Sequence, residues 1–188
     1  MDRIRKWLVP GIFLGLLLGV GLQFVSLVPD EDMNPSFFVG DVVVMLAVGW
    51  VGLQEGDVVA VVDPLDPGRW TLRRVTALGG MVRYENGMLY GDDASEKVLE
   101  MGRIPGEGMT AVVAQEGNHL VEHLSVAVRW EMEELIIPEG TAFLSADRRE
   151  AAMDSRWWGP VPAEAVQAVV MGRLGRPGHI WRGWVAGR

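Results

Sequence analysis

Cysteine is absent from the 188 residues of this chain, and histidine is scarce. Without cysteine the chain can form neither a disulfide nor a thiolate metal site. Of the three histidines (His119, His123 and His179), His119 and His123 are four residues apart, a spacing that could ligate zinc on a helix. No glutamate-bearing zinc-protease pattern surrounds them, and two polar residues in a solvated segment is the simpler interpretation. We therefore predict no metal and no cofactor.

Basic residues are outnumbered by acidic ones, 17 against 25, which gives a formal net charge of -8. A protein that binds a polyanion needs a basic face, so this composition argues against a nucleic-acid partner. Lysine is the scarcest cation, because Lys6 and Lys97 are the only two in the chain. Any chemistry that needs a neutral lysine amine must use one of these two residues.

An uncharged apolar run covers residues 7–28 in a chain that is 49% hydrophobic. A helix of this length spans about 30 Å, the thickness of the hydrocarbon core of a bilayer. Three basic residues precede the run and three acidic residues follow it, so the positive-inside rule places residues 1–6 in the cytoplasm. We predict a single-pass anchor, with the lipid bilayer as a partner and the domain on the extracytoplasmic side. A cleaved signal peptide is the alternative, but the run is long for one and no A-x-A-like site closes it.

Gly11, Gly15 and Gly19 recur every four residues and would share one face of the anchor helix. Small residues with this spacing let two membrane helices approach closely. The alternative is that they reflect the general abundance of glycine in membrane helices. The spacing predicts a contact with another membrane protein through this face.

Short β-branched runs separated by glycine and aspartate turns follow the anchor. They predict strands at 42–44, 58–62, 82–84 and 111–113, and Asn86-Gly87 predicts a tight hairpin turn. The fold class is therefore mostly β, an antiparallel domain at residues 29–172 with one N-terminal transmembrane helix. We predict that residues 92–134 are an irregular insertion or small lobe, that residues 162–171 are a helix or a strand, and that residues 173–188 form a basic tail containing tryptophan.

The segment Met153–Val161, which reads MDSRWWGPV, joins an ionic trio to an aromatic pair and a Gly-Pro turn. It resembles the last conserved block of type I signal peptidases, the leader peptidases of the S26 serine protease family. Further matching segments are DMNPS at 32–36 with Gly40-Asp41, GDVV at 56–59, LRRV at 72–75, PEG at 138–140 and ADRREAAMDSR at 146–156. The resemblance implies a membrane-bound β domain with a cleft that holds an extended peptide as an added strand.

The residues that the family uses for catalysis are replaced. The resemblance puts Asp32 at the position of the nucleophilic serine, Arg73 at the general-base lysine and Ala152 at the serine that orients that lysine. Arginine cannot be deprotonated in a protein, so it cannot act as a general base. Ser36 has no identifiable base. We predict that Asp32 and Arg73 form a bidentate ion pair where the dyad would be.

The kept residues are expected to be structural. They are Met33, Pro35, Gly40, Asp41, Arg74, Asp147, Asp154, Ser155 and Arg156. In particular, Asp154 and Arg156 should pair and hold the last block against the β core, and Trp157 and Trp158 should pack.

The sequence therefore predicts a membrane-anchored pseudoenzyme of this family with no working catalytic residue. Its expected role is to bind extended peptides, or to serve as a regulatory or structural subunit of a membrane assembly, with an active signal peptidase as one possible partner. The alternative is an active signal peptidase I-type serine endopeptidase that processes secreted proteins.

Overall fold

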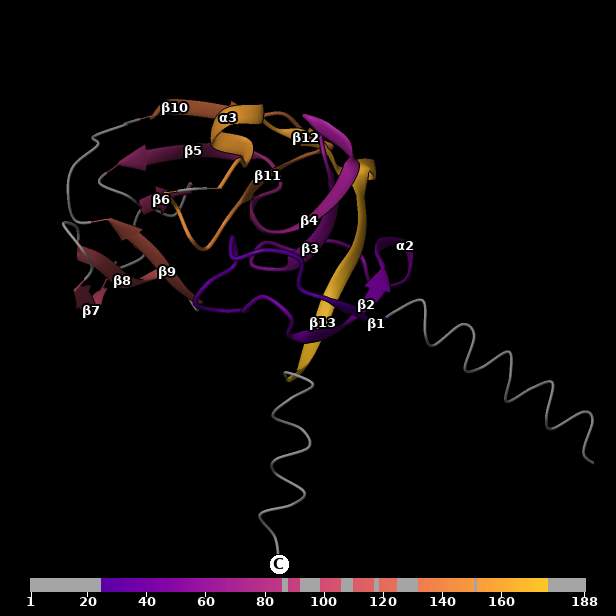
Figure 1. Ribbon diagram of the computed structural model, residues 1–188. Helices are drawn as coiled ribbons and strands as arrows, with labels where there is room; N and C mark the ends of the chain where they lie inside the picture. The colour runs from indigo at the N-terminus through magenta and orange to yellow at the C-terminus, as the bar shows by residue number, and fades with distance from the viewer. Residues whose placement is uncertain are drawn as a thin grey trace, which may run out of the picture.

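The computed structural model describes residues 25–85, 88–91, 99–105, 110–116, 119–124, 132–150 and 152–175. These residues form one large sheet and two small ones, with the small sheets to the left of the large one in Figure 1. Every pair of neighbouring strands in the described residues is antiparallel. The prediction of a mostly β, antiparallel domain is therefore confirmed.

The large sheet has seven strands in the order β1-β2-β13-β3-β4-β11-β12. Their bounds are β1 Val25–Leu27, β2 Val42–Ala47, β3 Val58–Asp63, β4 Asp66–Ala77, β11 Thr141–Ser145, β12 Val161–Pro162 and β13 Val166–Gly175. Between them lie three short helices, α2 at Val48–Val51, α3 at Ser155–Trp158 and the 3-10 helix η1 at Ala163–Ala165.

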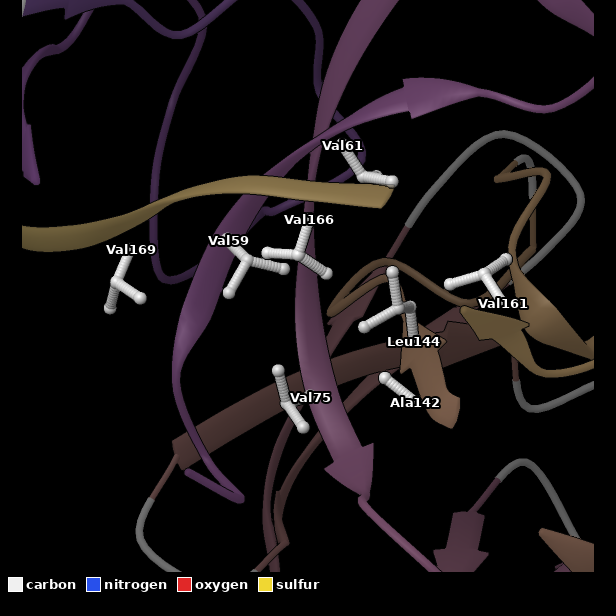
Figure 2. Close-up of a cluster of buried hydrophobic side chains, with 8 residues drawn as sticks. All are labelled: Val59, Val61, Val75, Ala142, Leu144, Val161, Val166 and Val169. Carbon is white, nitrogen blue, oxygen red and sulfur yellow. The ribbon is translucent and has the colours of Figure 1, made fainter. Parts of the chain in front are cut away.

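The core of the large sheet is built from small aliphatic side chains, most of them β-branched. Figure 2 shows one cluster in which strands distant in sequence meet, formed by Val59, Val61, Val75, Ala142, Leu144, Val161, Val166 and Val169. Valine fits the pleated surface of a sheet well. A second cluster contains Met33 and Val28, both fully buried, so the segment that leads to Asp32 is fixed to the sheet by packing.

The two small sheets have three strands each. One has the order β10-β5-β6, from Met132–Ile137, Gly80–Glu85 and Met88–Tyr90, and the other has the order β7-β8-β9, from Leu99–Pro105, Thr110–Glu116 and His119–Leu124. Tyr84 pairs with Leu89, so the predicted hairpin is confirmed in the strands on either side of the turn. The region 92–134, expected to be an insertion or small lobe, contributes β7, β8 and β9, and residues on β8 alternate: Val112, Ala114 and Glu116 are buried.

Three predicted boundaries are corrected. Val25–Leu27, expected at the end of the anchor, form β1 and pair with β2, and Val28 is buried in the core. The 162–171 segment is a helix only in η1, and its valine-rich part is β13, because Val166 and Val169 pack into the core. The predicted tail begins inside that strand, since Arg173 and Gly175 pair with β2.

No helix among the described residues is long and apolar enough to cross a membrane. The rest of the predicted anchor, with its glycine face, and the tail beyond residue 175 lie outside the described residues.

Candidate functional site at the dyad positions

Asp32 lies in a turn at residues 30–36 that connects β1 to β2. The buried Met33 side chain holds this turn from one side, and the amide of Arg148 donates to the Asp32 carbonyl over 2.8 Å from the other. Farther along, Gly40 adopts a φ of 79°, a conformation that favours glycine, and Asp41 accepts the Phe38 amide at 3.0 Å. Asp41 also accepts from Arg173 of β13 at 3.1 Å, which ties the segment to the sheet.

Arg73 lies on β4, and its side chain faces Asp32. Its Nη2 is 2.7 Å from Asp32 Oδ2, so the predicted ion pair is confirmed. The pair is not bidentate, however, because this is the one hydrogen bond between the two side chains. The Arg73 side chain is only 2% exposed and that of Asp32 is 16% exposed, so the pair is largely removed from water.

The rest of the Arg73 guanidinium binds carbonyl and hydroxyl oxygens. Nε and Nη2 donate to the Met153 carbonyl at 3.1 and 2.8 Å, and Nη1 donates to Thr71 Oγ1 and the Leu72 carbonyl, both at 2.6 Å. The guanidinium also lies over the Trp158 ring, 5.5 Å from its centre. All three guanidinium nitrogens thus have partners, and in this arrangement Nη1 binds Thr71 and Leu72 instead of the second oxygen of Asp32.

A row of polar residues extends this network along one face of β4. Arg69, Thr71 and Arg73 alternate on the strand and therefore share a face. Asp30 Oδ2 accepts from Arg69 Nη2 at 2.9 Å and from Thr71 Oγ1 at 3.0 Å. Asp30 is thus half-buried and paired, and is not a purely solvated residue. Sequence reasoning missed Arg69 and Thr71, although their alternation with Arg73 on a predicted strand was a usable signal.

The electrostatics of Asp32 do not suit nucleophilic chemistry. Burial raises its pKa above the ordinary value, an effect that outweighs the opposing attraction of Arg73, and the nearby Asp30 raises it further. Ala152, at the orienting position, is buried and has no polar group to offer. The Ser36 hydroxyl accepts from Arg74 Nη2 at 3.3 Å, and a guanidinium is no base for it. Neither Ala152 nor Arg74 can therefore take a proton from the Ser36 hydroxyl.

The bidentate pair expected at the dyad occurs one residue further along β4. Arg74 Nε and Nη2 are 2.8 and 2.6 Å from the two carboxylate oxygens of Asp147, which is fully buried. Arg74 Nη1 also donates to the Gly56 carbonyl at 2.8 Å. This arrangement holds the family's last block against β4, as expected of structural residues.

Asp154 and Arg156 form the second buried pair, as predicted. Asp154 caps α3 and accepts from the Arg156 amide, from Arg156 Nε and Nη2, and from the Ala146 amide, at 2.8 to 3.0 Å. Ser155 Oγ accepts the Leu144 amide of β11 at 2.9 Å. The expectation for the tryptophans holds for Trp158, which packs on the core, and is wrong for Trp157, which is 59% exposed.

A further ionic cluster connects the β7-β8-β9 sheet to the last block. Buried Glu116 accepts from Arg149 and, at 2.6 Å, from the Leu89 amide, and its Oε2 is 3.2 Å from His119 Nε2. Burial alone would raise the pKa of Glu116, but Arg149 and His119 lower it below the ordinary value. Among the described residues no group of three or more His, Asp or Glu is arranged to hold a metal ion.

The family model for signal peptidase, peptidase S26, matches residues 1–174. The chain therefore belongs to the signal peptidase family, peptidase S26.

The particular relatives are bacterial. Signal peptidase I of Pseudomonas fluorescens is 27% identical over 215 residues, and signal peptidase I of Pseudomonas aeruginosa is 28% identical over 209 residues. Each match covers 95% of this chain and 72% of the relative. The crystal structure of a signal peptidase I from Enterococcus faecalis V583 matches with a TM-score of 0.40 and 22% identity, over 62% of this chain and 95% of that one.

Proposed function

We propose that this protein is a catalytically silent member of the signal peptidase family that binds extended peptides at the site where its relatives have their dyad. The observation that carries the proposal is the state of Arg73, which is 2% exposed and bonded to Asp32, Thr71 and the carbonyls of Leu72 and Met153. A dyad of serine and lysine works because a buried lysine can lose its proton and accept one from the hydroxyl. Arginine stays protonated, so Arg73 cannot.

The charges around Asp32 also oppose acyl transfer. A tetrahedral intermediate needs donors aimed at its developing negative charge. Asp32 instead puts a carboxyl group at the nucleophile position, Asp30 lies near enough to raise its pKa, and Arg73 is already occupied by its own partners. The two Pseudomonas relatives bear the name signal peptidase I, which favours the alternative that the chain is an active endopeptidase.

Peptide binding does not require the dyad. In the described part of the chain, β4 between Trp70 and Arg73 pairs with β3 on one edge, while β11 pairs with β4 only from Arg74 onward. The other edge of β4 therefore has backbone groups that no described strand uses, and an extended peptide could add there as a strand once the buried Leu72 is uncovered. Met153 and Trp157, both substantially exposed, lie in the block that contributes the Met153 carbonyl to Arg73.

We further propose that the protein acts at a membrane, as a single-pass subunit whose anchor is the apolar run before β1. The family match extends across that run, since it begins at residue 1. The face formed by Gly11, Gly15 and Gly19 would contact another membrane protein, for which an active signal peptidase is one candidate. Copurification of the full chain from its native membranes tests this part, with Gly15→Leu expected to lose the partner.

Binding of a fluorescently labelled secretory leader peptide to the full chain in detergent tests the main proposal. We expect saturable binding that leaves the peptide intact. The matched control is the same peptide with alternate backbone amides methylated, which cannot donate to a strand edge and should bind much more weakly. Equal binding of both peptides, or no binding of either, would contradict strand addition.

A further inference from the structure

The backbone of Leu72 faces an edge of β4 that no described strand pairs with, and the residue is fully buried. The Val75 amide donates to the Asp57 carbonyl and the Val75 carbonyl accepts from Gly56, each at 2.8 Å, so the polar groups of Val75 point toward β3. The edge that a residue faces alternates along a strand, and the β3-β4 register has no irregularity between residues 71 and 74. The backbone N–H and C=O groups of Arg73 and Thr71 therefore also face β3. Those of Leu72 face the opposite edge, which β11 leaves unpaired at this point.

The Leu72 carbonyl is already occupied by the side chain of the next residue. Arg73 Nη1 donates to it over 2.6 Å, from a side chain that is almost fully buried. A carbonyl oxygen can accept two hydrogen bonds, but Leu72 is fully buried, so the N–H of an incoming strand cannot reach this acceptor while the guanidinium stays in place. A hydrogen bond from a charged donor is also stronger than one from a peptide amide.

We infer that Arg73 is a built-in competitor for the peptide, and that its guanidinium regulates the edge of β4 by capping the Leu72 carbonyl. This inference rests on the proposed function, since it assumes that peptides bind at this edge. The replacement of lysine by arginine then has two effects: it removes the general base, and it makes strand addition conditional on movement of Arg73.

The structure contains a second place for the displaced donor. Arg73 uses only one carboxylate oxygen of Asp32, over 2.7 Å. If Nη1 moves from Leu72 to the other oxygen, the pair becomes bidentate and the carbonyl is released. In the closed arrangement Arg73 Nη1 donates to the Leu72 carbonyl. In the open arrangement it donates to the second carboxylate oxygen of Asp32 instead. Peptide binding selects the open one.

The test compares affinities for the labelled leader peptide by fluorescence polarisation, with the full chain in detergent. We expect Arg73→Met to bind about tenfold more tightly than the wild type, the factor that corresponds to about 1.4 kcal/mol, roughly one competing hydrogen bond. The methylated peptide should gain no affinity. Arg83→Met, at an exposed arginine of β5, is the control and should leave affinity unchanged.

A second variant guards against misfolding. In Asp32→Asn/Arg73→Met both charges are removed, so no carboxylate is left unpaired, and we expect the same gain. If the wild type binds the peptide and both Arg73 variants bind it equally or more weakly, the inference is wrong and the proposed function stands. If none of the proteins binds the peptide, the proposed function fails, and the inference fails with it.

Discussion

Removing Arg73 should destabilise the domain far more than neutralising Asp32, although the two form one ion pair. In Arg73→Ala, Asp32 loses its cationic partner while its side chain is only 16% exposed, and the carbonyls of Met153 and Leu72 lose donors. Breaking a buried pair by removing one partner costs about 3–5 kcal/mol. The partial exposure of Asp32 favours the lower end, about 3 kcal/mol.

In Asp32→Asn, Arg73 keeps its contacts with Met153, Thr71 and Leu72. The sign of the Asp32 contribution follows from its pKa, which burial raises above the ordinary value of 3.8. A carboxyl with a raised pKa contributes stability that is fully present below 3.8 and is lost as the pH rises through the folded-state value. The amide oxygen of asparagine can still accept from Arg73 Nη2, and the other acceptors of Arg73 remain, so Asp32→Asn should change the free energy of unfolding by about 1 kcal/mol.

Thermal unfolding of the full chain in detergent at pH 7 measures both effects. For a protein of this size about 3 kcal/mol corresponds to roughly 6–12 °C in Tm, so Arg73→Ala should melt lower by that amount and Asp32→Asn within a few degrees of the wild type. An unchanged Tm for Arg73→Ala would refute the account of Arg73 as a buried hub. Equal losses in the two variants would show that the pair, and not the carbonyl contacts, fixes Arg73.

Two further predictions concern the residues that hold the last block. Asp154→Ala should cost about 3–5 kcal/mol, because Asp154 is fully buried and its loss leaves Arg156 without a carboxylate and the Ala146 amide without an acceptor. Exposed Glu164→Ala is the control and should stay within about 0.5 kcal/mol in denaturant unfolding. Arg149 and His119 lower the pKa of Glu116, so its stabilising contribution is present above 4.5 and is lost as the pH falls below that value. Stability of the wild type should therefore drop below pH 4.5 more steeply than that of Glu116→Gln, and parallel curves would count against the cluster.

The fold class was predictable because periodicity and turn residues are local. Valine runs and Asn86-Gly87 identified strands and a hairpin that the structure contains. Within 92–134 only part of β8 was predicted as a strand, because its alternating buried residues include the charged Glu116, whose burial depends on Arg149 in a distant loop. Likewise, β1 looked like the end of an anchor because apolar residues suit both a lipid environment and a sheet.

At the site, the pairing of Asp32 with Arg73 was predictable from the matched motifs, and the geometry of the pair was not. The number of contacts depends on competing acceptors, and the Met153 carbonyl is 80 residues away in sequence. The bidentate geometry occurs instead at Arg74 and Asp147, where a fully buried carboxylate has both oxygens directed at one guanidinium. Backbone carbonyls leave no signature in a sequence, so a structure was needed to find them.

Cleavage of a secretory leader precursor by the purified full chain, followed by mass spectrometry, tests the central claim most directly. Signal peptidase I of Pseudomonas aeruginosa, assayed in parallel, shows that the precursor can be cut. We predict no cleaved product from the wild type, because Arg73 cannot accept a proton and Asp32 has no hydroxyl group to attack the peptide. Cleavage by the wild type that Asp32→Ala abolishes would contradict the claim and establish an active peptidase.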